Sequence, residues 1–153
     1  MKRTLLLIAL VAIPVTAIAQ EQAAPPLAPP TTPDEFVAQR QARMGRGGGA
    51  LAMMKQTLDA NGDLTTLAPR IERLTQWATD LPTMFPEGSN TAASEAKPEV
   101  WSDRAGFNAA AERFRTAVQA LAAPAAANDH AAFQAAWTAA RASCQSCHDG
   151  YKS

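Results

Sequence analysis

Cys144, Cys147 and His148 form a Cys-x-x-Cys-His run close to the end of the 153-residue sequence. On a helix these three residues project from one face, because they stand at positions i, i+3 and i+4. Two thiols at this spacing can form thioethers with the two vinyl groups of one haem, and the adjacent imidazole can then bind the iron. The run therefore predicts one covalently attached haem c, with His148 as an axial ligand.

Three other interpretations of the two cysteines are weaker. A thiol redox pair normally sits at a helix N-terminus, which lowers a thiol pKa, whereas this pair is expected in the last turn of a helix. A structural zinc site needs a fourth ligand, and His130 stands about five turns earlier on the same helix, about 27 Å away. We expect His130 to be a solvated residue of a first helical turn. Inert side chains would be unusual for the only two cysteines in the chain.

The first residues have the pattern of an export signal. Lys2 and Arg3 form a positive region, residues 5–13 are apolar, and residues 17–19 read Ala-Ile-Ala, a small-x-small cleavage site. The apolar run is too short to span a membrane, so residues 1–19 are predicted to be a signal peptide. We expect the mature protein in the periplasm, without a membrane span, where haem attachment to such proteins takes place.

Composition limits the class of partner and the number of domains. The chain has 14 Lys and Arg against 14 Asp and Glu, and loss of Lys2 and Arg3 with the signal leaves a slight negative balance. So small a net charge does not indicate the basic surface that a nucleic-acid-binding protein needs. Residues 20–33 are rich in proline and alanine and predict a flexible spacer. Residues 34–153 are long enough for one domain with a real core.

Two helices are predicted in the first half of that domain. Thr32-Pro33-Asp34-Glu35 combines an N-cap, a proline at the first helical position and acidic first-turn residues. This first helix should run to about residue 59, where Asn61-Gly62 ends it. The second should run from about residue 66 to the residue before Pro82, because Pro69 is tolerated only within a first turn.

Two more helices follow the long connection formed by residues 83–100. The third should span about residues 102–122, with Pro124 as its stop. The fourth should be capped by Asn128 or Asp129 and run to about residue 150. Short loops between consecutive helices favour antiparallel neighbours.

Apolar residues recur at three- and four-residue spacing in these segments, as expected for helices that bury one face. The three sets are Leu64, Leu67, Ile71, Leu74, Ala78 and Leu81; Phe107, Ala111, Phe114, Val118 and Leu121; and Phe133, Trp137, Ala140, Cys144, Cys147 and Tyr151. The predicted fold is all-α, an antiparallel up-down-up-down four-helix bundle with the covalently bound haem near one end.

The first helix has an irregular inward face. Val37, Met44, Leu51 and Leu58 recur every seven residues, yet the inward positions between them include Arg40 and Gly47. Further glycines at 45, 48 and 49 each cost about 1 kcal/mol against alanine in a helix interior. A charge and a glycine cluster facing the core are understandable if a large flat group occupies that space. The alternative is a helix that is flexible or broken at MGRGGG (44–49).

Taken together, these features resemble the class II c-type cytochromes, the family of cytochrome c′ and its low-spin relative cytochrome c556. The resemblance covers roughly residues 34–152. The matching segments are RQARM (40–44), LPTMFPEGS (81–89), AKPEVWSDRAGF (96–107) and CQSCHDGY (144–151). It implies an antiparallel four-helix bundle, usually a homodimer, with the haem wedged between helices at one end.

The resemblance also implies roles for individual residues. Cys144 and Cys147 match the thioether anchors and His148 the proximal ligand. Met44 falls where the family places its distal residue, and Arg40 matches an arginine beside a haem propionate. Four residues after the histidine the family usually has arginine, and here Lys152 offers a point charge without the planar fork.

Met44 leaves two functions open. If its sulfur binds iron, the protein is a six-coordinate low-spin electron carrier with a potential raised by the thioether. If Met44 only packs over an open face, the iron is five-coordinate and can bind NO or CO. We take single-electron transfer with redox partner proteins of the periplasm as the primary prediction and gas binding as the alternative. Neither function makes the protein an enzyme.

Overall fold

The computed structural model describes residues 28–153. The predicted signal peptide (1–19) and most of the predicted spacer (20–33) lie outside the described residues. Within the described range no helix is both long enough and apolar enough to cross a membrane.

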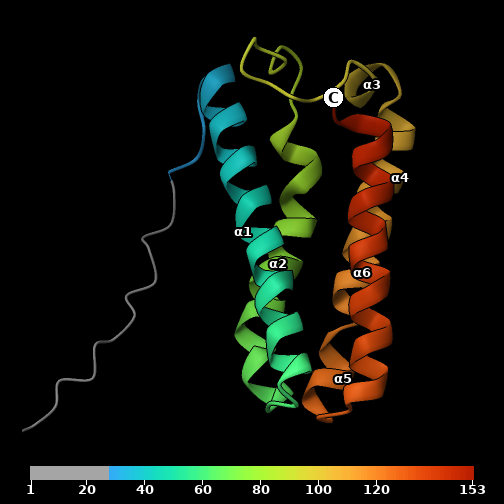
Figure 1. Cartoon of the computed structure of the whole chain (residues 1–153). Coiled ribbons are helices and arrows are strands. Elements are labelled where there is room, and N and C mark those ends of the chain that lie inside the picture. The colour runs from blue at the N-terminus through green and yellow to red at the C-terminus, as the bar shows by residue number, and fades with distance from the viewer. Residues whose placement is uncertain (1–27) are drawn as a thin grey trace, which may run out of the picture.

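Four long helices form the body of the molecule (Figure 1). They are α1 (Pro33–Asp59), α2 (Ala68–Asp80), α4 (Arg104–Gln119) and α6 (His130–Tyr151). Each of α1 and α4 contacts both α2 and α6, so the four helices close a ring around one core. Consecutive long helices run in opposite directions. The predicted all-α antiparallel four-helix bundle is therefore confirmed.

Side-chain caps explain where the long helices begin. Thr32 accepts a hydrogen bond from the backbone of Glu35, whose carboxylate accepts one from the Thr32 backbone, a complete capping box. The carboxylate of Asp129 accepts a hydrogen bond from the backbone N–H of Ala132 and so caps α6. Asn128, the other predicted cap, has a positive φ of 51° and accepts from the Leu64 backbone instead.

Four short helical segments occupy the connections. They are η1 (Leu64–Leu67), η2 (Leu81–Met84), α3 (Glu99–Ser102) and α5 (Ala122–Ala126). The predicted third helix over about residues 102–122 is confirmed as α4, which begins two residues later because Asp103 leaves the helical conformation (φ −115°, ψ 58°) and caps it through the Gly106 N–H. Pro124 does not act as a stop after residue 122. It lies in the first turn of α5, where its missing N–H is tolerated.

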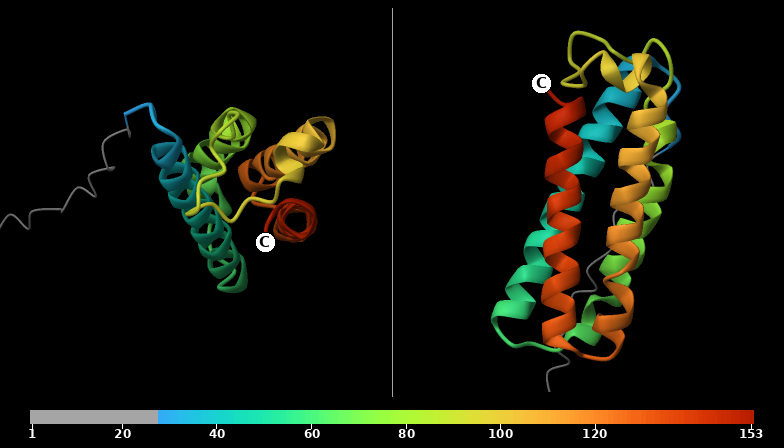
Figure 2. Two further views of the ribbon diagram at one scale, coloured as in Figure 1. Left: turned by 90° about the horizontal axis from the view of Figure 1, so that it is seen from above. Right: turned by 90° about the vertical axis from the view of Figure 1, so that its right-hand side faces the viewer.

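Helix α1 is continuous through the glycine cluster, so the alternative of a broken helix at MGRGGG was wrong. Figure 2 shows α1 inclined to the other three long helices. A Cβ on Gly47 would lie 3.3 Å from Leu74 Cδ1 and 3.7 Å from Trp77 Cδ1, so this glycine lets α1 and α2 approach closely. A Cβ on Gly45, Gly48 or Gly49 would meet nothing within 4 Å.

This difference between the glycines gives a stability prediction. Gly48→Ala should raise the free energy of unfolding by about 1 kcal/mol, because alanine is the better helix former and has open space here. Gly47→Ala should gain less or lose stability, since its Cβ presses on Leu74. Urea unfolding of the two variants and the parent measures both effects. Equal gains in the two variants would contradict the close approach at Gly47.

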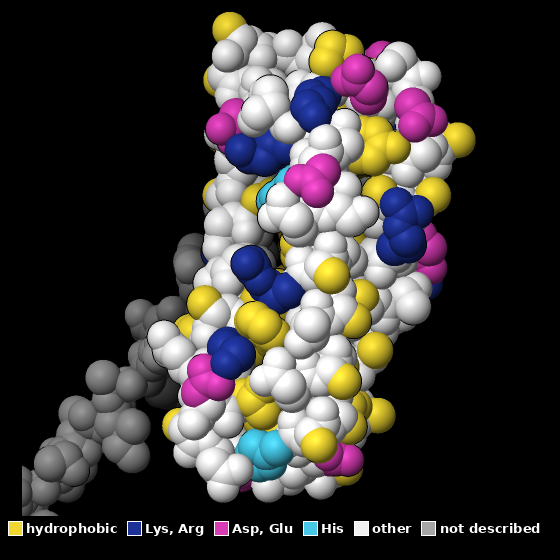
Figure 3. Space-filling view, turned by 45° about the vertical axis from the view of Figure 1, so that its right-hand side comes forward, with side chains coloured by type: hydrophobic (Ala, Val, Ile, Leu, Met, Phe, Trp, Pro, Cys, Tyr) yellow, Lys and Arg dark blue, Asp and Glu magenta, His cyan; other side chains and the backbone are white. Residues whose placement is uncertain are grey.

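His130 is more than the solvated first-turn residue expected from the sequence. Its Nε2 lies 2.9 Å from the Gly62 carbonyl oxygen and its Nδ1 lies 3.2 Å from that of Asn128. The residue is half-buried and ties the start of α6 to the turn after α1. The two histidines lie at opposite ends of the bundle (Figure 3), so His130 plays no part in the chemistry at His148.

Candidate haem site

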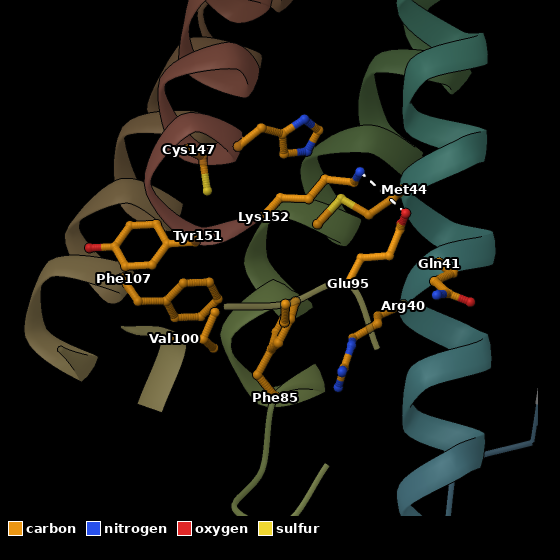
Figure 4. A pocket seen from close by; sticks show the side chains of 12 residues that line it. Arg40, Gln41, Met44, Phe85, Glu95, Val100, Phe107, Cys147, Tyr151 and Lys152 are labelled. Atoms are coloured by element: carbon orange, nitrogen blue, oxygen red, sulfur yellow. Dashed lines mark ion pairs between the residues drawn. The ribbon is translucent and has the colours of Figure 1, made fainter. Parts of the chain in front are cut away.

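A cavity of about 160 Å³ lies at the end of the bundle where α6 finishes (Figure 4). Its walls come from α1, α3, α4, the last turn of α6 and the connection before α3. The lining residues are Arg40, Gln41, Met44, Phe85, Glu95, Ala96, Val100, Phe107, Cys147, His148, Tyr151 and Lys152. Five of the six residues of the predicted site therefore meet at one cavity, Cys147 and His148 among them, and Cys144 lies about one helical turn earlier on α6.

The side chains of the terminal run are available for attachment. Neither Cys144 nor Cys147 forms a disulfide, and both are half-buried. Figure 4 shows the Cys147 sulfur pointing into the cavity. Cys144 does not line the cavity but packs against the core. The ring of His148, exposed at the cavity edge, makes no hydrogen bond to any residue in the described range.

The protonation states at this helix end favour haem binding over thiol redox chemistry. Burial raises the pKa of both the Cys144 and the Cys147 thiol, so neither is the activated thiolate that a redox pair requires. Partial burial of the ring and then the charge of Lys152 lower the pKa of His148. A lowered pKa keeps the imidazole neutral at pH 7, and the neutral form is the one that binds a metal.

Met44 lies on α1, on the wall of the cavity that faces α6 (Figure 4). It is half-buried and packs against the core. The structure therefore places a thioether and an imidazole on two different helices that border one space. The sequence predicted this juxtaposition only through the family resemblance, because about a hundred residues separate the two positions.

Arg40 is almost fully buried, with 4% of its surface exposed. Its guanidinium donates to Ser89 Oγ (2.9 Å), the Ser89 carbonyl (2.7 Å) and Ser94 Oγ (2.6 Å), and it lies 4.6 Å from the Phe85 ring centroid. All these partners are neutral, and within the described residues Arg40 forms no ion pair. A buried cation without a counter-ion in the wall of a cavity fits an anionic group such as a propionate.

The end of α6 is tied to the connection before α3. The Lys97 N–H donates to the Tyr151 carbonyl (3.0 Å), and the Ser153 N–H donates to that of Glu95 (2.9 Å). Lys152 Nζ lies 3.5 Å from Glu95 Oε1, and both side chains border the cavity. Exposure makes this ion pair weak. Lys152 thus lies beside the predicted haem site, engaged with a carboxylate.

A second contact fixes the last turn of α6 against the first turn of α4. The Tyr151 hydroxyl donates to Asp103 Oδ2 at 3.1 Å, and its ring meets Phe107 edge to face with centroids 5.4 Å apart. Gly106 lies directly beneath, where a Cβ would come within 2.6 Å of the Tyr151 hydroxyl and would overlap the Asp103 carboxylate. The absence of a side chain at Gly106 therefore lets α6 dock here.

Sequence reasoning missed the part of the cavity wall built by the long connection and by Gln41. Glu95 and Ala96 reach the cavity from that connection. The segment 96–107 was recognised as typical of the family, but its sequence has no periodicity from which a contact with the chain end could be inferred. Only the antiparallel bridge between Ala96 and Lys152 reveals it.

A four-helix bundle with a two-cysteine and histidine run at one end defines a class of covalent haem proteins. The family model described as Cytochrome C' matches residues 35–152 of this chain. The chain therefore belongs to the cytochrome c′ family, and like the members of that family it is a haem protein with covalently bound haem c.

Individual relatives agree with this assignment. Cytochrome c′ from Rubrivivax gelatinosus is 44% identical over 71 residues, which are 46% of this chain and 55% of that protein. Cytochrome c′ from Pararhodospirillum photometricum is 31% identical over 126 residues, 79% of this chain and 98% of that protein. The chain spans only about half the length of the first two curated relatives it matches, 55% and 51%.

Solved structures extend the likeness over the whole bundle. The crystal structure of the Rubrivivax gelatinosus protein has a TM-score of 0.71 and 30% identity, covering 79% of this chain and 97% of that one. A nitric oxide complex of a cytochrome c prime variant from Alcaligenes xylosoxidans has a TM-score of 0.72 and 27% identity, covering 79% and 95% of the two chains.

Proposed function

We propose that the protein transfers single electrons through one haem held at this cavity. Cys144 and Cys147 are the thioether anchors and His148 is the proximal ligand. The observation that carries the proposal is that a thiol, a free imidazole, a thioether and a buried guanidinium from distant parts of the chain line one largely apolar cavity. When bound, the haem supplies an iron that cycles between the ferric and ferrous states.

The residues of the cavity have separate tasks in this proposal. His148 provides a neutral imidazole, and Met44 presents its sulfur from the opposite helix as the possible sixth ligand. Arg40 provides a positive charge for a propionate, in addition to its hydrogen bonds to the connection. Phe85, Phe107 and the other apolar side chains exclude water, which tunes the reduction potential of a bound haem.

Gas binding is the second candidate function. It is supported by the structures of the Alcaligenes xylosoxidans relative, which are described as complexes with nitric oxide and with carbon monoxide. Met44 belongs to both proposals, as a ligand in the first and as a packing residue over an open iron in the second. The periplasm, redox partner proteins and pairing of two copies remain parts of the proposal that follow from the export signal and the family.

A spectrum of the purified protein separates the two functions. Electron transfer with Met44 as ligand predicts a low-spin spectrum with a Met–iron charge-transfer band that does not respond to CO. Met44→Ala should then lose this band and become CO-sensitive, whereas Met53→Ala, an exposed methionine on the same helix, should change nothing. A high-spin parent protein that already responds to CO would exclude Met44 as ligand and favour gas binding.

A further inference from the structure

The long connection before α3 touches both sides of the haem cavity. Its residues 93–97, which we call the strap, cross the end of the bundle from α1 to the end of α6 (Figure 2). Glu95 and Ala96, in the middle of the strap, line the cavity between these two helices (Figure 4). Helix α1 carries Met44 and α6 carries His148. The strap therefore joins the two walls that would face the opposite sides of a haem.

Two side chains of α1 hold the first half of the strap. Gln41 Nε2 donates to the Ala93 carbonyl at 3.0 Å. The buried Arg40 guanidinium donates to Ser94 Oγ at 2.6 Å, and a hydrogen bond from a charged donor is stronger than one between neutral groups. The first half of the strap therefore follows α1 at the turn that precedes Met44.

Backbone pairing holds the second half of the strap to the end of α6. An antiparallel bridge joins Ala96 to Lys152, and the flanking backbone groups are hydrogen-bonded at 2.9 and 3.0 Å. The Lys152 N–H in turn donates to the His148 carbonyl at 2.9 Å and closes the last turn of α6. The Lys97 side chain reaches the Asp149 carbonyl at 2.8 Å. The second half of the strap therefore follows the turn that bears the axial histidine.

Ser94 joins the two halves of the strap. Its hydroxyl oxygen accepts one hydrogen bond from Arg40 and a second, at 3.1 Å, from the backbone N–H of Ala96. Ala96 is the residue that pairs with Lys152. A continuous series of polar contacts thus runs from the guanidinium on α1 through one hydroxyl to the end of α6. The oxygen uses both of its acceptor positions in these bonds, so a side chain without it would separate the two halves.

The same two helices are tied a second time on the other side of the cavity. Trp137 Nε1 on α6 donates to the Leu51 carbonyl on α1 at 2.8 Å. Along α1, Met44 lies between this contact and the strap, and along α6 His148 does the same. The space between Met44 and His148 is therefore closed at one end by the indole and at the other by the strap. Release of the strap would leave α1 held to α6 at only one of these two places.

We propose that Ser94 is a positioning residue, which through the strap fixes the separation between Met44 and His148. The proposal rests on the haem site proposed above and holds for either function. With the strap intact, Met44 stays close to the sixth coordination position, as a ligand or as a packing residue over an open iron. With the strap released, α1 moves away from α6 at this end of the bundle, and a gas reaches the sixth position more easily.

The test measures CO binding to the ferrous holoprotein after Ser94→Ala. The dissociation constant of CO should fall about tenfold, a factor that corresponds to the loss of one hydrogen bond of a charged donor. In a protein with Met44 on the iron, a weaker Met–iron charge-transfer band should accompany this change. Ser94→Thr keeps the hydroxyl and adds one methyl group at a half-exposed position, so it should bind CO as the parent does.

Ser89→Ala is the matched control for lost stability. The Ser89 hydroxyl also accepts a hydrogen bond from Arg40, at 2.9 Å, but it lies outside the strap and does not bond to Ala96. Ser89→Ala and Ser94→Ala should therefore both unfold at a lower urea concentration than the parent. Only Ser94→Ala should change the binding of CO.

Amide hydrogen exchange of the same holoproteins reports on the strap directly. The N–H groups of Ala96, Lys97 and Ser153 donate within the strap or in its pairing with α6, and they should exchange faster in Ser94→Ala. The Ala132 N–H, capped at the start of α6, should exchange as in the parent. This measurement depends on neither electron transfer nor gas binding.

Two results would overturn the proposal. One is a Ser94→Ala protein that binds CO with the affinity of the parent. The other is a Ser94→Thr protein that is altered as much as the alanine variant, which would show that the hydroxyl does not join the two halves. Failure of the haem site itself is recognised separately, because the mature mass of the parent would then lack one haem, and the proposal would fall with the site.

Discussion

A chain with both Cys144 and Cys147 changed to alanine is expected to carry no covalently bound haem. The two thiols stand on one face of the last turns of α6, neither is in a disulfide, and the Cys147 sulfur points into the cavity. Removing both removes every thioether that the chain can form, because it has only these two cysteines. The mature mass should fall by one haem in addition to the two sulfur atoms.

Extraction with acidified solvent distinguishes attachment from mere binding. The parent protein should keep its haem through the extraction, and the double variant should release any haem that His148 still holds. Ser146→Ala, a change at an exposed neighbour on the same turn, should behave as the parent. A double variant whose haem resists extraction would refute the assignment of these cysteines as anchors.

Arg40→Ala is expected to lower the free energy of unfolding of the holoprotein by about 3 kcal/mol. The guanidinium holds the connection before α3 through four hydrogen bonds to Met84, Ser89 and Ser94, two of them to a serine that is fully buried. Their loss leaves buried acceptors without a donor. Removing a buried charge offsets part of this cost, but the bonds of a charged donor are the larger effect.

Urea unfolding measures this change, with Arg43→Ala as its control. Arg43 lies one turn further along α1, and its half-buried pair with Asp80 should contribute less than about 1 kcal/mol. An Arg40→Ala protein as stable as the parent would show that the hydrogen bonds are incidental. The burial of Arg40 would then be explained only by an anionic ligand that binds its guanidinium.

The helices were predictable from local chemistry, and their interruptions less so. Thr32, Glu35 and Asp129 signal helix starts through short-range hydrogen bonds that a sequence displays directly. The short helices α3 and α5 were not predicted, because segments of four and five residues are too short to show an apolar periodicity. Pro124 was predicted to end the third helix. A proline ends a helix only where its backbone N–H would be needed for an intrahelical hydrogen bond, and the sequence does not show whether position 124 is such a place.

The candidate site divides in the same way. Cys144, Cys147 and His148 lie within little more than one helical turn, so their spacing alone predicts that they project from the same face of the helix. Met44 and Arg40 depended on the family resemblance, since no local pattern relates α1 to the end of α6. The hydrogen bonds of Arg40 to Ser89 and Ser94 could not be predicted at all, because those serines lie in an irregular connection without periodicity.

The docking of Tyr151 over Gly106 has a consequence for how such a protein can change over evolution. The helix that bears the attachment run is anchored to α4 and to the connection, whereas Met44 belongs to α1, an inclined helix rich in glycine. Substitutions in α1 can therefore widen or narrow the space opposite His148 while the anchored side keeps its place. In the course of evolution, substitutions in this single helix could therefore open or close the sixth coordination position of the iron.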